Sequence, residues 1–341
     1  MKLASRSSMF ALASLLGVAA CTAPTDATDA ANGEVGQTDD ELVGGTVDAK
    51  DSWSVGICSS ELNTDPKKGN IGACVEPHTR CSGSLIAPNL VLTARHCVRQ
   101  IDYADGFCDS TFNDKPLTSA KIRVTRASSV LDKGAYWRDV ERVLTPSSTR
   151  SACEGDIALL VLKNPIPGAQ TVKVDLDTNL TAKHPTKLTV VGRGMITNDI
   201  DLTTLEPINE QLGGAKKRVL ENIPFLCVSD IDNTCTVEDA TSPPSNVFAL
   251  PAAFFLTGPG IGSGDSGSGV LDGATYTAHD PVLIGVNVAG TFDTKTGHGN
   301  AGLAVRIARH KTFVVGAVAW AAAKGGYAIP AWARFADGFG K

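Results

Sequence analysis

Cys81-Ser-Gly-Ser-Leu-Ile-Ala-Pro-Asn-Leu-Val-Leu-Thr-Ala-Arg-His96-Cys97 contains two short apolar runs with a Pro-Asn pair between them. Because proline and asparagine favour turns, and runs this short suit strands, the stretch predicts an antiparallel strand pair. A histidine beside a cysteine closes the stretch. The sequence therefore predicts a β-structure in which a strand leads directly into a candidate catalytic residue, His96.

The same pattern of short apolar runs and turn residues continues from Val43 onward. Short apolar runs are separated by Gly, Pro, Asn and Asp, and the lengths of these runs suit strands rather than helices. The runs are Ile157-Ala-Leu-Leu-Val-Leu, Leu188-Thr-Val-Val, Val282-Leu-Ile-Gly-Val-Asn-Val and Leu303-Ala-Val. Many short strands with turn residues between them indicate antiparallel barrels or a sandwich. A length of 341 residues allows one large domain or two packed halves.

One segment, at about 308–324, predicts a helix instead. Alanine favours helix, and the Gly325-Gly326 pair that follows favours its end. The segment is short for a membrane span, so we expect it to pack on the β-structure. Long polar stretches at about 60–80, 100–150 and 198–246 predict surface loops or insertions, and the tail at 327–341 is expected to pack against the domain.

Two further motifs carry residue types for nucleophilic catalysis. Gly260-Ile-Gly-Ser-Gly-Asp-Ser266-Gly-Ser-Gly269 holds a serine among glycines, which let a backbone approach a substrate closely. Glu154-Gly-Asp156-Ile-Ala-Leu-Leu160 places an aspartate at the start of an apolar run. Each motif alone has an ordinary explanation, because Gly-Asp-Ser-Gly is commonly a turn and such an aspartate is commonly a cap.

Together the three segments closely resemble the trypsin/chymotrypsin-like serine peptidase family. Its hallmarks read here as Thr93-Ala-Arg-His-Cys97, Asp156-Ile-Ala-Leu-Leu160 and Gly264-Asp-Ser-Gly267. The order His, Asp, Ser is also the family's order, unlike that of subtilisin or α/β-hydrolases. The resemblance implies an all-β fold: two packed six-stranded antiparallel β-barrels with a C-terminal helix.

The resemblance covers most of residues 43 to about 323, and it implies a serine peptidase domain over residues 43–341. The first barrel is expected at about 43–165 and the second at about 180–308. Such an enzyme acts on proteins or peptides and needs no metal and no cofactor. Two other functions stay open: a protease-like binding protein that has lost activity, which an intact triad argues against, and a serine esterase, which the order of residues disfavours.

The resemblance also implies roles for individual residues. His96, Asp156 and Ser266 would form the catalytic triad, because a serine hydroxyl is a poor nucleophile until a positioned base removes its proton. The backbone N–H groups of Gly264 and Ser266 would form the oxyanion hole.

Cysteine usage fits this family. Nine cysteines are present, and without Cys21 an even eight remain, which suits an oxidising compartment. Order along the chain does not fix the pairing, because eight cysteines allow 105 connectivities. From the resemblance we expect only the pair Cys81 with Cys97, which would fix the loop of His96.

Glu41-Leu-Val-Gly-Gly-Thr46 resembles the family's activation junction. Cutting there would release a new N-terminus at Val43, whose amine would pair with Asp265. A buried carboxylate needs such a partner, and the pair would order the oxyanion loop. Because Leu42 replaces the usual basic residue, the activating protease is expected not to be trypsin-like; the alternative is that Val-Gly-Gly is a plain linker end.

The resemblance places a specificity pocket around Gly260, Ala289 and Gly290. In the family, the residue six before the catalytic serine lies at the base of this pocket, and cleavage after Lys or Arg needs an Asp there. Here that residue is Gly260, and Ala289 stands where a tryptophan is usual. The sequence therefore predicts an uncharged pocket for apolar or small side chains.

Residues 1–20 predict an export signal, because a basic start is followed by a short apolar run and small residues. Leu16-Gly-Val-Ala-Ala-Cys21 resembles the lipobox of bacterial lipoproteins, in which the cysteine is acylated. The alternative is ordinary secretory cleavage after Ala20. The protein is thus expected to be exported, and either secreted or held at the cell envelope, with a lipid on Cys21 as its only membrane contact.

Residues 21–42 predict an acidic linker or propeptide. Residues 22–42 hold six acidic side chains and no Lys or Arg, with almost no large apolar residues, so burial cannot offset the entropy of ordering. The formal net charge is −5, which leaves the rest of the chain near neutral. A near-neutral domain offers no basic face, so we expect no nucleic-acid partner.

Overall fold

The computed structural model describes residues 16–17, 45–65, 71–74, 80–102, 108–147, 150–180, 182–194, 201, 203, 216–229, 235–239, 246–292 and 297–334. Cys21, Leu42 and Val43 lie outside these residues, as does the acidic segment 21–42. Of the expected signal segment, the described part is β1 (Leu16–Gly17), which pairs with β14 (Thr236–Asp239).

The first barrel contains the strand pair expected from residues 81–97. Six strands close in the order β10-β5-β4-β3-β8-β9. Pro88 and Asn89 form the turn between β4 and β5, and Leu85 pairs with Val91 across it. The strands of this barrel are β3 (Ser54–Cys58), β4 (Arg80–Ala87), β5 (Leu90–Thr93), β8 (Arg123–Thr125), β9 (Trp137–Leu144) and β10 (Ala158–Leu162).

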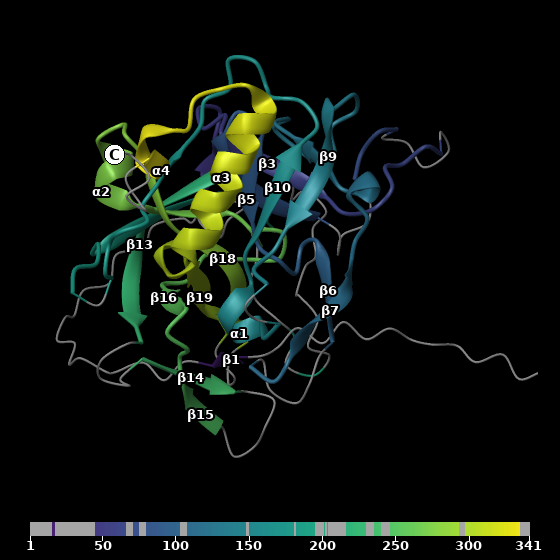
Figure 1. Cartoon of the computed structure of the whole chain (residues 1–341). Coiled ribbons are helices and arrows are strands. Elements are labelled where there is room, and N and C mark those ends of the chain that lie inside the picture. The colour runs from purple at the N-terminus through teal and green to yellow at the C-terminus, as the bar shows by residue number, and fades with distance from the viewer. Residues whose placement is uncertain are drawn as a thin grey trace, which may run out of the picture.

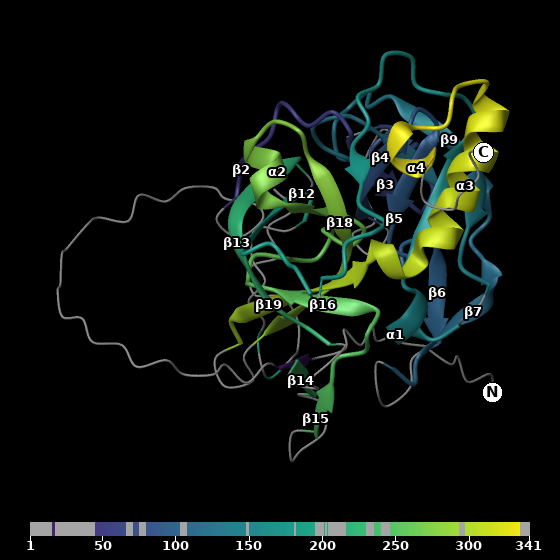
Figure 2. The same ribbon diagram turned by 60° about the vertical axis from the view of Figure 1, so that its left-hand side comes forward.

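The second barrel follows the order β18-β17-β12-β13-β16-β19 and closes because β18 also pairs with β19. Figure 2 shows the barrels side by side, with β12, β13 and β18 in one and β3, β4 and β5 in the other. The predicted fold class is therefore confirmed. The strands of this barrel are β12 (Lys187–Gly192), β13 (Arg218–Val228), β16 (Phe254–Thr257), β17 (Gly269–Asp272), β18 (Val282–Phe292) and β19 (Gly299–Arg306).

Smaller elements connect and extend the barrels. β11 (Lys173–Val174) runs parallel to β18, β15 (Asn246–Ala249) extends the pair β1-β14, and β6 (Arg99–Asp102) pairs with β7 (Thr111–Pro116). The short helices are η3 (Ser119–Lys121), α1 (Ala152–Gly155), α2 (Gly273–Thr277), η4 (Ile307–His310) and α4 (Ala331–Arg334).

The C-terminal helix α3 (Lys311–Gly325) follows the turn of η4 and packs on β4 and β10 of the first barrel (Figure 1). Gly326 caps its C-terminal end, and the φ of 68° at this residue is the left-handed conformation that glycine adopts most easily. The described part of the tail, residues 327–334, also packs against the domain: the Tyr327 hydroxyl donates to Asn89 in the β4–β5 turn, and Ala333 of α4 is buried. Among the described residues, no helix is long and apolar enough to span a membrane.

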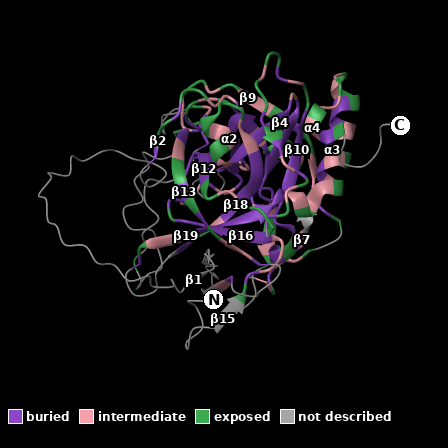
Figure 3. Ribbon diagram, turned by 90° about the vertical axis from the view of Figure 1, so that its left-hand side faces the viewer, coloured by how far each residue is buried: buried purple, intermediate pink, exposed green. Residues whose placement is uncertain are grey.

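One apolar core runs through both barrels, as the buried strands in Figure 3 show. Leu159 of β10 and Leu283 of β18 belong to the same buried cluster, so the barrels meet through apolar side chains. This contact between the barrels matters because the predicted catalytic residues come from both of them. Burial of such side chains is the main favourable term in folding.

Two expectations about the fold were wrong in part. The polar stretches at about 100–150 and 198–246 were expected to be loops, yet they contain β8, β9 and β13. The sequence of β9 resembles a polar loop because only Val140 of this strand is buried, so the other positions need not be apolar. Likewise, the expected first barrel at about 43–165 includes β2 (Thr46–Val47), which instead pairs with β13 of the second barrel.

All eight cysteines after Cys21 are paired in the structure. Cys81 and Cys97 are joined with an S–S distance of 2.02 Å. The other three disulfides join Cys58 to Cys74, Cys108 to Cys153, and Cys227 to Cys235.

Candidate active site

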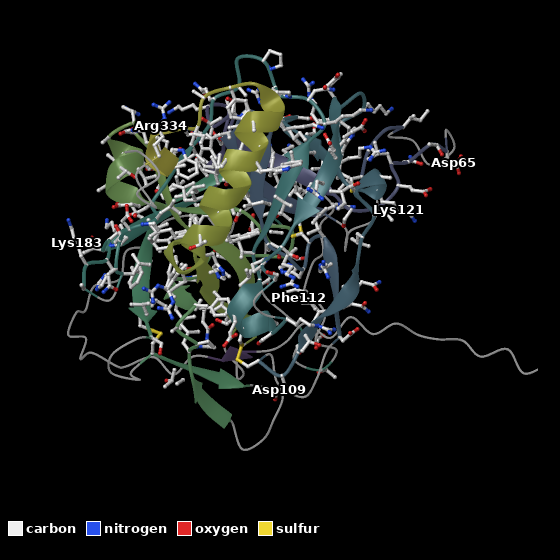
Figure 4. The ribbon with its side chains drawn as sticks, in the orientation of Figure 1. Asp65, Asp109, Phe112, Lys121, Lys183 and Arg334 are labelled. Carbon is white, nitrogen blue, oxygen red and sulfur yellow. A yellow bond between two sulfur atoms is a disulfide. The ribbon has the colours of Figure 1, made fainter. Side chains whose placement is uncertain are left out.

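His96 lies just beyond β5, on a loop that is fixed on both sides. The preceding Arg95 is buried, and its guanidinium lies 4.4 Å from the ring centroid of Phe112 of β7 (labelled in Figure 4). Burial and the nearby Arg99 lower the pKa of Arg95 to about 10, so it stays protonated at neutral pH. The following Cys97 is tied to β4 by its disulfide with Cys81. The ring of His96 is thereby presented from a rigid support.

Asp156 ends the short helix α1 immediately before β10. Ser151 caps the start of this helix by accepting the N–H of Cys153, and Cys153 is tied to Cys108. The Asp156 side chain is 1% exposed and accepts the backbone N–H of His96 on Oδ1 at 2.9 Å. Its Oδ2 lies 2.8 Å from His96 Nδ1. The structure thus brings the first two predicted triad residues into direct contact.

The pKa of His96 is raised. Burial of the ring lowers the pKa, but the charge of Asp156 and the hydrogen bond to it raise the pKa by more. Because Nδ1 faces the carboxylate, Nε2 is the nitrogen left for proton exchange with a substrate or nucleophile.

The Ser266 loop belongs to the second barrel and docks on the first. The Ser266 carbonyl accepts the N–H of Ser82 in β4 at 2.8 Å. Gly267, with φ of 82°, lies so close to Thr93 and Ser82 that an added side chain would overlap both. The loop is held from behind as well, because the Gly267 N–H donates to the Asn287 carbonyl at 2.7 Å. Ser266 therefore lies against the strand that leads to His96.

Within the described residues, the Ser266 hydroxyl and the His96 ring share no hydrogen bond. Catalytic hydrogen bonds are often long in proteins without substrate and tighten when substrate binds. The shared support of the two residues on β4 and β5 is compatible with that behaviour.

Asp265, beside the serine, is fully buried and organises the loop before it. Its Oδ1 accepts the N–H of Gly194 at 2.7 Å, and its Oδ2 accepts the N–H of Gly262 at 3.1 Å. Neither Gly192 nor Gly194 leaves room for a side chain beside this carboxylate. Gly264 has φ of 92°, a conformation that other residues rarely adopt. Val43, the expected partner of Asp265, lies outside the described residues.

The predicted pocket residues lie close to one another. Gly260 is buried, with φ of 121°. A side chain on Gly290 would meet the Ile261 carbonyl at 2.7 Å, and one on Gly302 would meet the Ile261 side chain at the same distance. Ala289 is half-buried beside Gly290 in β18. Ile261, which sequence reasoning missed, thus adds an apolar side chain beside the predicted pocket.

One cluster could suggest a metal site, since ligand atoms of Cys81, His96 and Cys97 lie within 4.8 Å of one another. Both sulfur atoms are bound in the disulfide, so no thiolate remains to bind an ion.

Sequence reasoning also missed supporting residues around the loop. Ser82 of β4 contacts the serine loop through Gly264, and Arg193, directly after β12, donates its backbone N–H to the Ser82 hydroxyl. Asn287 of β18 binds Ser268 through its side chain at 2.8 Å. None of these carries a sequence signal of its own, because each acts through contacts with residues far along the chain.

The model of the trypsin family matches residues 63–314. The chain belongs to the trypsin family. The matched span of this trypsin-family protein contains His96, Asp156 and Ser266 and ends within α3. No curated protein sequence matches the chain. Membership confirms the family resemblance of the three motifs and the trypsin-like serine protease fold.

Proposed function

We propose that this protein is a serine endopeptidase that hydrolyses peptide bonds through an acyl-enzyme formed on Ser266. The observation that carries the proposal is the double contact of His96 with Asp156, at 2.9 and 2.8 Å, just beyond the strand against which the Ser266 loop packs. His96, Asp156 and Ser266 are far apart in the sequence, and the fold brings the segments that carry them together.

The proposed reaction begins when His96 Nε2 takes the proton of the Ser266 hydroxyl as the oxygen attacks the scissile carbonyl. The N–H groups of Gly264 and Ser266 stabilise the oxyanion, each contributing about 3 kcal/mol. His96 then protonates the leaving amine, which departs with the C-terminal part of the substrate. Water attacks the acyl-enzyme with His96 again as base, which releases the acid and restores the serine. Asp156 holds the ring and stabilises the imidazolium.

Labelling with a fluorophosphonate tests this proposal. The mature protein should label at Ser266 and degrade casein, while Ser266→Ala should do neither. Labelling with cleavage of simple esters but not of casein or peptides would indicate an esterase instead. A folded wild-type protein that does not label would indicate a binding protein.

For specificity, we propose an uncharged pocket for apolar or small side chains before the cut. Gly260 at the pocket base brings no carboxylate, and Ile261 adds an apolar wall against Gly302. A lysine or arginine would lose its hydration there without gaining a partner. Peptide substrates with Leu, Phe, Ala or Arg before the cut should be cleaved with Arg the poorest, and a strong Arg preference would overturn the proposal.

For activation, we propose that cutting after Leu42 releases Val43 to pair with Asp265. Contacts of the described residues support this. Gly45 is buried, and its carbonyl accepts from Arg218 at 3.2 Å. Arg218 pairs in the sheet with Gly192, which lies against the Asp265 carboxylate.

The amine of Val43 is two residues from Gly45, and two residues span at most about 7 Å. The proposed pairing therefore requires the Asp265 carboxylate to lie within about this distance of Gly45. N-terminal sequencing of active protein should begin at Val43. The activator need not prefer basic residues, because Leu42 precedes the cut.

We also propose that the protein is exported, since trypsin-like domains with several disulfides are typical of oxidising compartments. If Cys21 is acylated, cutting at Leu42 would release the domain from its anchor. A labelled fatty acid should then mark the uncut chain and not the active form. An active, intact, lipid-bearing chain would contradict the proposed activation and the release of the domain.

A further inference from the structure

Ser82 of β4 connects the first barrel to two loops of the second. It is fully buried, and its hydroxyl donates to the Gly264 carbonyl at 3.0 Å while accepting the Arg193 N–H at 2.9 Å. Its own N–H donates to the Ser266 carbonyl at 2.8 Å, and its carbonyl accepts the Thr93 hydroxyl at 2.8 Å. Every polar group of Ser82 is therefore bonded, and two of its bonds hold residues of the serine loop.

The backbone of Gly264 depends on such a hydrogen bond more than its neighbours do. It lies between the two peptide units whose N–H groups would form the oxyanion hole, and it has φ of 92°. Glycine moves between backbone conformations more freely than any other residue. Because the peptide unit is planar, fixing the Gly264 carbonyl also fixes the plane that leads to Asp265. The Ser82 hydroxyl thus restrains the most mobile type of residue in the loop.

The other partner of the hydroxyl is itself firmly anchored. Arg193 is 3% exposed, and its guanidinium donates to the Ser54 hydroxyl at 3.0 Å and to the carbonyls of Ser54 and Ala127 at 3.1 Å each. Burial lowers its pKa to about 9, so it remains protonated at neutral pH. Arg193 is therefore held to the first barrel by its side chain and, through Ser82, by its backbone. The hydroxyl of Ser82 lies between this fixed segment and Gly264.

We propose that Ser82 is a positioning residue for the oxyanion hole: its hydroxyl holds the Gly264 peptide so that the N–H groups of Gly264 and Ser266 converge on one point. The inference rests on the proposed peptidase function and extends it to the first barrel. Removing the hydroxyl would leave the Gly264 carbonyl without its donor and the Arg193 N–H without its acceptor, so that this peptide would keep only the bond from the Asp265 N–H to the Gly262 carbonyl, at 3.1 Å. Oxyanion stabilisation acts mainly in the transition state, so the loss should fall on kcat.

The same strand offers a matched control. Ser84 is also buried, at 1% exposed, and its side chain faces Gly269. Among the described residues, its hydroxyl has no hydrogen-bond partner. Ser84→Ala therefore removes the same atom from the same strand without breaking a bond. A general effect of removing a buried hydroxyl from β4 would appear in both variants.

The experiment compares Ser82→Ala and Ser84→Ala in the mature enzyme, with rates normalised to sites titrated by a fluorophosphonate. Ser82→Ala is expected to lower kcat by about 10- to 100-fold with KM within about twofold, since losing one oxyanion donor outright costs 100-fold or more. Affinity for a peptide boronic acid, which forms a tetrahedral adduct, should fall by the same factor. Affinity for a peptide amide without a reactive group should not change. Ser84→Ala should match wild type in all of these.

A lower unfolding midpoint in Ser82→Ala with kcat per titrated site unchanged would mean a structural role only and would overturn the inference. Equal losses in both serine variants would overturn it too. If Ser82→Ala does not fold, Ser82→Thr keeps the hydroxyl and Ser82→Val has nearly the same shape without it; equal kcat in these two would overturn the inference. Inactivity of the wild-type enzyme would instead contradict the proposed function, so the two failures are distinguishable.

Discussion

His96 contacts Asp156 through two groups, its backbone N–H at 2.9 Å from Oδ1 and its ring Nδ1 at 2.8 Å from Oδ2. Burial lowers the pKa of His96, and the charge and hydrogen bond of Asp156 raise it by more. Because a general base works only when unprotonated, activity should fall as the pH drops through this raised pKa. We expect the acid limb of kcat/KM to have its midpoint above about 6.5, the usual histidine value. A pH profile with a peptide substrate checks this.

Asp156→Asn should move that limb and slow the reaction. Without the carboxylate charge, burial dominates and the pKa of His96 falls, so the acid limb should shift to lower pH. The rate should drop by about 10,000-fold, because the amide no longer holds the required tautomer. Asp139→Asn is the control, since Asp139 lies on β9 with a side chain 56% exposed and should leave both quantities unchanged. An unshifted limb in Asp156→Asn would mean that Asp156 does not set the pKa of His96.

Gly267→Ala should abolish activity and reduce stability. Its added carbon would overlap the Thr93 hydroxyl and the Ser82 carbonyl, and φ of 82° disfavours any side chain. The two atoms belong to neighbouring strands and cannot both retreat, so the Ser266 loop must move. Denaturant unfolding and fluorophosphonate labelling measure the two effects.

Gly316→Ala is the matched control, because Gly316 is exposed in α3 with nothing within 4 Å of the added carbon. It should gain up to about 1 kcal/mol of stability, since alanine favours helix over glycine. If Gly267→Ala also labels normally, the close packing of the loop on β5 is not required for reactivity.

The parts of this fold that sequence predicted are those with strong local signals. β4 and β5 contain apolar runs, β10 is apolar along its whole length, and the Gly325-Gly326 pair marks the end of α3. β9 was missed because it lies at the surface and half of its side chains are charged, and its place is set by pairing with β8 and β10. Local composition cannot report a strand whose stability comes from its neighbours.

The residues of the candidate site likewise fall into those with a local sequence signal and those without one. His96, Asp156 and Ser266 stand in recognisable motifs, so sequence could name them. Ser82 and Arg193 could not be named, because their roles depend on hydrogen bonds that join residues more than 100 positions apart. A serine two residues farther along β4 has no such role, and only the structure distinguishes the two.

The buried ion pair between Lys217 and Asp48 should contribute to stability. Its atoms lie 3.2 Å apart, with side chains 7% and 1% exposed, and it ties the segment after the proposed activation junction to the second barrel. Lys217→Met should lower the free energy of unfolding by about 3 kcal/mol, because the Asp48 charge stays buried. Lys121→Met breaks an exposed pair with Glu61 and should cost less than about 1 kcal/mol. Equal costs in denaturant titrations would mean that the buried pair is not special.

Gly260→Asp should not convert the enzyme to cleavage after arginine. The new carboxylate would be at the pocket base, but Gly260 has φ of 121°, where a side chain costs about 1–3 kcal/mol of strain. The pocket backbone should therefore distort, and kcat/KM for a Leu substrate should fall about 10-fold or more while an Arg substrate gains little. Gly260→Ala separates the causes, since it adds the strain without the charge and should lose as much on Leu. Efficient cleavage after Arg by Gly260→Asp would show that the backbone accepts a side chain there, and that the missing carboxylate alone excludes basic substrates.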